Sequence, residues 1–284
     1  MFKNSMKTAV LLAAMGGLII VIGSFFGTGG LYLGLLLALV LVGGSYWFSD
    51  KLAIAAARAH EVSEADAPEL YATVRDLAQR AEMPMPRVYI SEEQQPNAFA
   101  TGRNPEHAAV CVTRGILAAL TPDELKGVLA HEMAHVQHRD ILIGSVAAAV
   151  AMGITFVARF AMFGALFGGG GGRDRDSGNV FGMLAMVILA PIAAAMIQMA
   201  ISRSREFEAD RGGAALLGNG EPLARALEKI DGYARKIPMN VNPAQENMFI
   251  VSPFSGRKVG FSGLFSTHPP VEERIRRLRE HAAA

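Results

Sequence analysis

The sequence predicts a mainly α-helical protein with a small β-sheet, an α+β fold fused to about four transmembrane helices. Two observations lead to this fold class: long uncharged apolar stretches gather in two blocks, and the polar segments around them carry helix caps and short strand patterns. The composition agrees, because hydrophobic residues make up 51% of the chain and 30 glycines bring the total to roughly 60%, above the about 45–50% of a soluble domain.

The first apolar block predicts two membrane-spanning helices joined by a tight turn. Uncharged residues run from Thr8 to Phe26 and from Leu31 to Phe48, with glycines in the turn at 27–30. Each stretch is close to the about 20 apolar residues that a helix needs to cross a bilayer. Tyr46 and Trp47 lie where an interfacial aromatic belt is expected. The first stretch is longer than the apolar part of a signal peptide, which argues against cleavage.

The second apolar block predicts another pair of spans, a helical hairpin at 141–201. Ile141–Phe167 is apolar except for Arg159, and Val180–Ile201 is apolar except for Gln198. Two buried soluble helices would also explain these stretches, but their lengths favour spans. Arg159 weakens the case for the third span, unless it snorkels to the interface or faces the bundle interior.

The positions of lysine and arginine predict that both termini and both polar segments are cytoplasmic. Basic residues stand at Lys3, Lys7, Lys51 and Arg58 and again after the fourth span, whereas the turn at 27–30 has none. The two polar segments together form one domain, which the second hairpin interrupts. The predicted divisions are two N-terminal spans at 1–48, the first polar part at 49–140, the hairpin at 141–201 and the second polar part at 202–284.

The first polar part contains the predicted sheet. Residues 69–82 have the apolar spacing of a helix, and three short segments have strand character. These strand candidates are Arg87–Ile90, Asn97–Thr101 and Ala108–Thr113, the last two separated by a turn.

The next helix has a strong starting signal. Thr121 suits the N-cap, Pro122 suits the first helical position and Glu124 completes a capping box. No proline or glycine interrupts the sequence between Val128 and Ile143, so we expect the helix to continue unbroken into the third span.

This helix contains the sequence His131-Glu132-Met133-Ala134-His135. At 100° per residue the two histidines lie about 40° apart on one face, one turn apart, so both rings can reach one metal ion. Glu132 lies about 60° beyond His135, where its carboxylate can face a water beside the ion without binding the metal. Two histidine ligands and a carboxylate base are the parts that zinc-dependent hydrolysis needs.

A third ligand must come from elsewhere in the chain. His138 points about 60° further from His131, which makes joint ligation awkward. In the acidic cluster after the fourth span, Glu206 and Asp210 share one helix face, with Glu208 opposite. Asp210 is then placed to hydrogen-bond a ligating group. The candidates for third ligand are His138, Asp140, Cys111, His107 and the cluster at 206–210.

Four features in a fixed order carry a family resemblance. They are His131–His135, a four-helix membrane pattern, the segment Ser202–Asp210 and the motif Thr267–Pro270. Together they resemble the HtpX family, bacterial membrane zinc metalloproteases related to the CAAX prenyl proteases, over almost the whole chain. The resemblance implies a zincin-type catalytic domain of the gluzincin kind, one zinc ion per subunit, Glu206 as third ligand and Glu132 as general base.

The resemblance also implies a setting and further residues. It implies quality control of misfolded or damaged membrane proteins, a stress response, in the bacterial cytoplasmic (inner) membrane. His268 resembles a family histidine that donates to the oxyanion of the tetrahedral intermediate, and Arg274 resembles a family arginine near the site. The stretch at 96–102 resembles a family segment beside the edge strand where substrate adds. Its substrate-binding candidates are Asn97, Ala98, Phe99 and Ala100.

Helix continuity also predicts the distance from the zinc to the membrane. His135 precedes Ile141 by six residues and Glu206 follows Ile201 by five, which corresponds to about 9 and 7.5 Å. If both helices run straight into the bilayer, the zinc lies within roughly 10 Å of its cytoplasmic surface.

Three alternatives stay open beside a membrane-embedded zinc endopeptidase. They are a non-proteolytic membrane scaffold with a vestigial zinc site, a CAAX-type protease and an intramembrane protease of the site-two type. The last needs an Asn-Pro-Asp-Gly partner motif that Asn242–Gln245 does not supply, and the additional spans of a CAAX protease do not fit this length.

The expected partners are membrane-protein substrates and the lipid bilayer. A net charge of +1 gives no sign of a nucleic-acid partner. The sequence leaves the oligomeric state open and is compatible with a homo-oligomer. The single cysteine, Cys111, excludes an internal disulfide and falls in a candidate edge strand.

Overall fold

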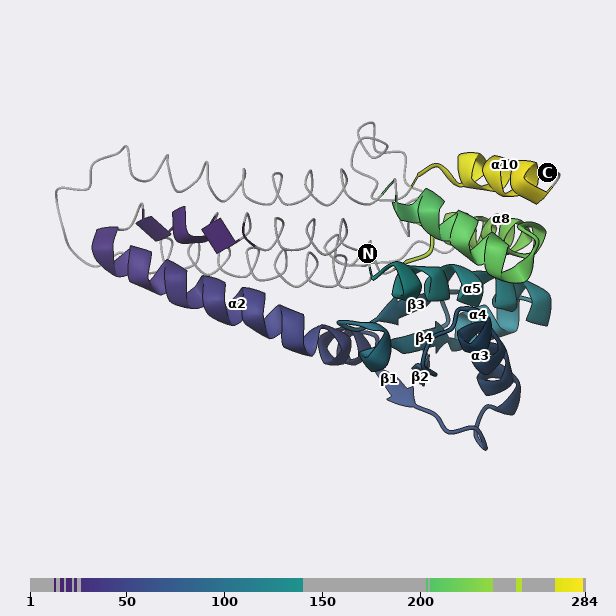
Figure 1. The fold of residues 1–284 in the computed structure, drawn as a ribbon, viewed down its shortest axis with the longest axis horizontal. Coiled ribbons are helices and arrows are strands. Elements are labelled where there is room, and N and C mark those ends of the chain that lie inside the picture. The colour runs from purple at the N-terminus through teal and green to yellow at the C-terminus, as the bar shows by residue number, and fades with distance from the viewer. Residues whose placement is uncertain are drawn as a thin grey trace.

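The structure is a computed structural model that describes residues 27–139, 205–236, 249–251 and 269–282, with isolated positions in 13–24 and at 203. The hairpin at 141–201, with Arg159, and most of the first N-terminal span lie outside the described residues. Figure 1 shows the long helix α2 extending from a body in which a small sheet lies beside several helices. The mainly helical α+β fold with a small sheet is confirmed.

Helix α2 (Gly27–Ala56) contains the second predicted span. It begins at Gly27, whose φ of +77° suits glycine, so the predicted turn residues already belong to the helix. Many of its large apolar side chains are exposed, among them Leu39 at 66% and Val40 at 59%. Over the part of the chain that the structure describes, no helix meets both the length and the apolarity of a membrane crossing. The number of transmembrane helices therefore stays a prediction.

Four strands form one sheet in the order β1-β2-β4-β3. β1 is antiparallel to β2, β2 is parallel to β4, and β3 is antiparallel to β4. The three predicted strands are confirmed, whereas the short β1 was not predicted. The strands are β1 (Ala59–Glu61), β2 (Arg87–Ser91), β3 (Ala98–Thr101) and β4 (Ala109–Thr113).

The strand order corrects one expectation. β3 is an edge strand, but β4 lies between β2 and β3, so Cys111 is in an interior strand and not at an edge. The Cys111 side chain is fully buried, and this burial raises the pKa of its thiol to about 12. A thiol with so high a pKa is a packing group rather than a reactive one.

Helices cover the sheet and enclose the main core. Leu129 and Met133 of α5 pack with Leu227 of α8 and with Val110 of β4, all almost completely buried. The helix predicted at 69–82 is confirmed as α3. The helices are α3 (Pro68–Arg80), the short 3-10 helix η1 (Pro105–His107), α4 (Arg114–Ala119), α5 (Pro122–His138), an unlabelled helix at 205–217, α8 (Glu221–Lys236) and α10 (Val271–Ala282).

The two ends of α5 differ in how well they were predicted. The capping box is confirmed, because Thr121 accepts from Glu124 N and the Glu124 side chain accepts from Thr121 N. Lys229 of α8 adds an ion pair to Glu124 at 2.7 Å. The expected continuation into the third span is wrong: α5 ends at His138, and Arg139 has a left-handed φ of 56°. The distance to the membrane estimated from a straight helix therefore no longer holds.

Candidate metal centre

Helix α5 brings His131 and His135 together in the interior of the protein. His131 is 1% exposed, and its Nε2 lies 3.2 Å from Nε2 of His135. The two rings meet edge to face, with centroids 4.7 Å apart. This is the arrangement that one helical turn between two histidines predicts.

The helix at 205–217 crosses α5 at very short range because both contact residues are small. A Cβ on Gly213 would lie 2.8 Å from the backbone N of His131, and a Cβ on Gly212 would lie 2.8 Å from Cβ of Ala134. Only glycine permits this approach at position 213, where the neighbours are backbone atoms. Because the two helices lie so close, the buried side chains of Glu206 and Asp210 lie beside His131.

Three side chains form a cluster with the dimensions of a zinc site. Glu206 oxygens lie 3.7 Å from Nε2 of His131 and 3.7 Å from Nε2 of His135. All three ligand atoms lie within 4.8 Å of one another. Zinc bonds of about 2.0–2.2 Å in tetrahedral geometry place ligand atoms roughly 3.3–3.6 Å apart. The donor set and its spacing therefore fit a zinc ion.

Asp210 and Arg274 lie directly behind the cluster. Oδ1 of Asp210 is 3.0 Å from Nδ1 of His131, so this ring nitrogen can donate to the carboxylate and leave Nε2 for a metal. Arg274, 0% exposed, donates to both Asp210 oxygens at 2.8 and 2.9 Å. Its Nη1 lies 3.3 Å from Glu206, so one guanidinium orients two carboxylates.

The charges of this interior also favour a divalent cation. Three buried carboxylates, on Glu132, Glu206 and Asp210, face one buried guanidinium, which leaves two negative charges when all three are ionised. Burial acts to raise the pKa of Asp210, but the charge of Arg274 and the hydrogen bonds lower it to about 2. Uncompensated buried charge is costly, and a doubly charged metal ion balances it.

Glu132 is fixed beside the cluster by the edge of the sheet. Its Oε2 accepts a hydrogen bond of 2.8 Å from the backbone N of Ala100 in β3. Burial raises the pKa of the Glu132 carboxyl, although His131 and His135 act in the opposite direction. Glu132 is 6% exposed, so it is a buried carboxylate and not a surface glutamate.

Comparison with known proteins decides the family. The model of peptidase family M48 matches residues 64–282. This chain belongs to peptidase family M48. The membership makes the protein a zinc metalloprotease, with the cluster of His131, His135 and Glu206 as the group that could bind the ion.

Full-length relatives agree with the M48 assignment. The chain is 55% identical over 277 residues to a protease HtpX homolog of Syntrophobacter fumaroxidans, which covers 96% of this chain and 98% of that protein. It is 53% identical over 277 residues to the homolog of Syntrophotalea carbinolica, with 97% and 98% covered. The resemblance to the HtpX family is thus confirmed.

A solved structure supports the fold. The crystal structure of Ste24p from S. mikatae aligns with a TM-score of 0.52 and 21% identity, covering 98% of this chain. The chain spans 65% of the length of that protein. At this identity the likeness shows an M48-type fold and nothing finer.

Of the four substrate-binding candidates, Ala100 has a backbone contact with the site, the hydrogen bond from its N to Glu132. The side chains of Ala98 and Phe99 are buried in the core. Asn97 is also buried, and its Oδ1 accepts from Ile250 N at 3.2 Å, so its side chain joins two chain segments. Ala100 is half-buried, and the substrate-binding role of this segment remains a prediction. His268, the expected oxyanion donor, lies outside the described residues.

Two contacts were not foreseen from the sequence. Ile250 O accepts from Nη1 of Arg274 at 2.9 Å, so the segment 249–251 links Arg274 to Asn97. The backbone N of Ala100 as the partner of Glu132 was also missed. Both contacts use main-chain atoms, which carry no residue-type signal in a sequence.

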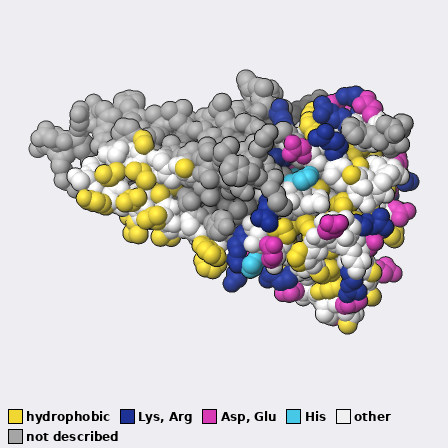
Figure 2. Space-filling model, viewed as in Figure 1, with side chains coloured by type: hydrophobic (Ala, Val, Ile, Leu, Met, Phe, Trp, Pro, Cys, Tyr) yellow, Lys and Arg dark blue, Asp and Glu magenta, His cyan; other side chains and the backbone are white. Residues whose placement is uncertain are grey.

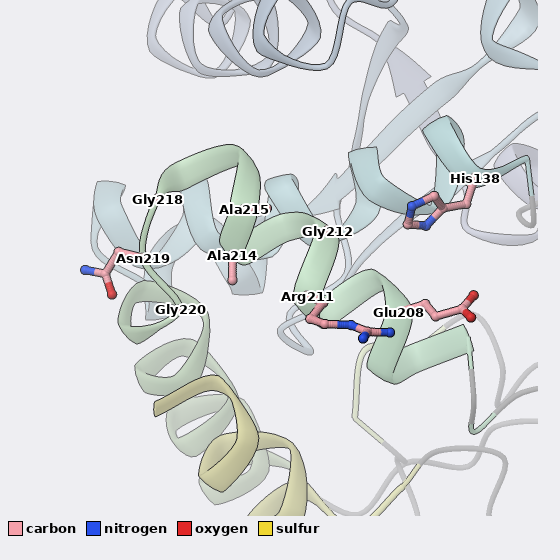
Figure 3. A pocket seen from close by; sticks show the side chains of 9 residues that line it. All are labelled: His138, Glu208, Arg211, Gly212, Ala214, Ala215, Gly218, Asn219 and Gly220. Atoms are coloured by element: carbon pink, nitrogen blue, oxygen red, sulfur yellow. The ribbon is translucent and has the colours of Figure 1, made fainter. Parts of the chain in front are cut away.

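His138 and Glu208 lie apart from the zinc cluster of this M48 protease. They line a hollow of about 680 Å³ along the helix 205–217, together with Arg211. Figure 3 shows the side chains of Glu208 and Arg211 on this helix and His138 near the end of α5. Glu208 is exposed, whereas Glu206 and Asp210 on the other face are buried.

Proposed function

We propose that the protein is a membrane-attached zinc endopeptidase that cleaves misfolded or damaged membrane proteins at the cytoplasmic face. The observation that carries the proposal is the hydrogen bond between Glu132 and Ala100 N. It joins the base to an edge strand beside the ligand cluster. Such an edge can receive a substrate strand by main-chain hydrogen bonding.

The residues of the site have separate roles in the proposed hydrolysis. His131, His135 and Glu206 would hold the zinc ion, which would supply a positive charge to polarise the substrate carbonyl and ease deprotonation of water. Glu132 accepts the proton of the attacking water and returns it to the leaving amine. A carboxyl whose pKa burial has raised is suited to hold that proton briefly.

The ligand shell is kept in place by the groups behind it. Asp210 fixes the ring of His131 through Nδ1, and Arg274 fixes Asp210 from both oxygens. His268 is expected to donate to the oxyanion, and this role remains a prediction.

Membrane attachment is supported by the exposed apolar side chains of α2. Figure 2 shows hydrophobic side chains spread over the part of the molecule that α2 forms, away from the charged surface of the domain. Leu36, Leu39, Val40 and Trp47 are each more than half exposed. A patch of this kind on a long helix marks contact with lipid or another protein. The four-span arrangement and the cytoplasmic position of the domain belong to the proposal.

A tethered reporter tests both parts of the proposal. One peptide loop, either free or linked to a membrane anchor, is offered to the full chain in lipid vesicles. Cleavage should stop with a chelator and return with zinc, and the anchored loop should be cut faster. If the anchored and free loops are cut at equal rates, the membrane-substrate assignment is wrong. If a chelator has no effect, the zinc mechanism is wrong.

A further inference from the structure

A second hollow lies where the end of α2 meets the sheet, and its lining includes none of the three zinc-ligand candidates. It has a volume of about 510 Å³. Figure 2 shows basic side chains gathered close to where the hydrophobic surface of α2 meets the domain. The lining combines aromatic, basic and apolar groups, among them Trp47, Phe48, Lys51, Met85, Arg87 and Arg103.

Two of the basic groups stand over exposed aromatic rings. Nζ of Lys51 is 5.7 Å from the centroid of Phe48, and Cζ of Arg103 is 5.0 Å from the centroid of Trp47. The rings themselves are 53% and 58% exposed. A cation over a ring face keeps N–H donors for an anionic acceptor, because the ring occupies only one side of it.

The ion pairs around the hollow distinguish Lys51 and Arg103 from Arg87. Arg87 forms an ion pair with Asp50 at 2.7 Å and donates a hydrogen bond to the Tyr89 hydroxyl at 3.0 Å. Among the described residues, no carboxylate forms an ion pair with Lys51 or Arg103. The remaining acidic lining residue, Glu106, is exposed. Lys51 and Arg103 are therefore the groups that can take an external negative charge.

The loop that carries Arg103 is tightly built. Gly102 has a φ of +134°, and a Cβ there would lie 2.4 Å from the carbonyl oxygen of His107. The backbone N of His107 donates to Oδ1 of Asn104 at 3.0 Å. Arg103 is thus presented on a preorganised turn directly after β3, which lowers the entropic cost of binding a ligand.

We propose that this hollow binds the phosphate headgroup of an anionic phospholipid, with Lys51 and Arg103 as its contacts. The inference rests on the proposed membrane attachment. Along α2, exposed aliphatic side chains are followed by Trp47 and Phe48 and then by Lys51. This order matches the acyl chains, the interface and the headgroups of a bilayer. A headgroup held at Arg103 fixes the substrate-binding edge β3 relative to the lipid surface.

Trp47 provides a built-in reporter, because it is the single tryptophan of the chain. The full-length protein is placed in phosphatidylcholine nanodiscs that contain equal fractions of either brominated phosphatidylcholine or brominated phosphatidylglycerol, and quenching of Trp47 is compared. We expect stronger quenching by phosphatidylglycerol, with a preference of about 5-fold for each basic contact. The ratio of the two lipids cancels changes in the intrinsic fluorescence of a variant.

Variants assign the preference to named residues. Lys51→Gln and Arg103→Gln should each reduce it by about 5-fold or to unity, and Glu106→Gln should increase it. Arg225→Gln, an exposed arginine of α8, is the matched control and should leave it unchanged. Each variant should still cleave casein, which shows that it is folded.

The outcomes separate the inference from the proposed function. Equal quenching by both lipids, or a preference that survives both glutamine variants, overturns the headgroup site while the membrane attachment stands. No quenching by either lipid overturns the membrane attachment and the site with it. If the two lipids quench equally while inorganic phosphate binds with an affinity that both glutamine variants lower, the hollow binds free phosphate and not a lipid.

Discussion

Replacing Gly213 by alanine tests whether the close helix crossing sets the geometry of the zinc site. A Cβ at this position would lie 2.8 Å from N and 3.0 Å from Cα of His131. These are backbone atoms, so no side-chain rotation relieves the contact. Ordinary contacts begin near 3.4 Å, and the helix that carries Glu206 must therefore retreat by roughly 0.6 Å.

The size of the effect follows from that retreat. Metal–ligand distances tolerate deviations of about 0.2 Å, so the Glu206 bond to zinc is weakened or the helices are strained. Overpacking of this kind costs about 1–3 kcal/mol. Because 1.4 kcal/mol corresponds to a factor of ten, the Kd for zinc should rise by about 5- to 150-fold.

The assay is a zinc titration of the purified full chain against a competing chromophoric chelator. Gly127→Ala is the matched control. A Cβ at Gly127 would lie 2.6 Å from N of Leu223 in α8, a helix that contains no zinc-ligand candidate. This control should lower the free energy of unfolding without changing the Kd. If Gly213→Ala leaves the Kd unchanged, or if Gly127→Ala raises it equally, the reasoning is refuted.

Three further predictions concern the groups that support the site. Arg274→Met should lower the free energy of unfolding by about 3–5 kcal/mol, because Asp210 is left buried without its cation, and Arg274→Lys should not restore it; a loss below 1 kcal/mol in denaturant unfolding would contradict this. Thr121→Ala should cost about 1 kcal/mol as a lost N-cap, and an unchanged melting temperature would speak against it. Burial acts to raise the pKa of Glu124, but hydrogen bonds from Lys229 and Thr121 hold it below its ordinary value. Its stabilisation is therefore present above the pKa of the unfolded carboxyl and disappears as the pH falls through the folded value, so wild type should lose more stability than Glu124→Gln between about pH 5 and 3; parallel losses would refute the assignment.

The sequence predicted the local parts of this protein well because their signals are local. The capping box of Thr121 and Glu124 and the spacing of His131 and His135 depend on helix geometry alone. The shared face of Glu206 and Asp210 follows from the same periodicity.

Features that depend on tertiary contacts or on single backbone angles were harder to predict. The end of α5 was missed because Arg139 adopts a left-handed conformation that is rare outside glycine and asparagine. The interior position of β4 was missed because strand order is set by the parallel pairing of β2 with β4 across an intervening segment. The burial of Arg274 depends on Asp210, 64 residues away.

The role of Glu132 as general base is tested most directly by Glu132→Gln. Zinc content and casein cleavage are measured on the same preparation, with the exposed Glu208→Gln as control. We expect Glu132→Gln to keep one zinc per chain while cleavage falls by at least about 100-fold, and Glu208→Gln to keep both zinc and activity. Cleavage by Glu132→Gln at a rate close to wild type would show that Glu132 is not the general base.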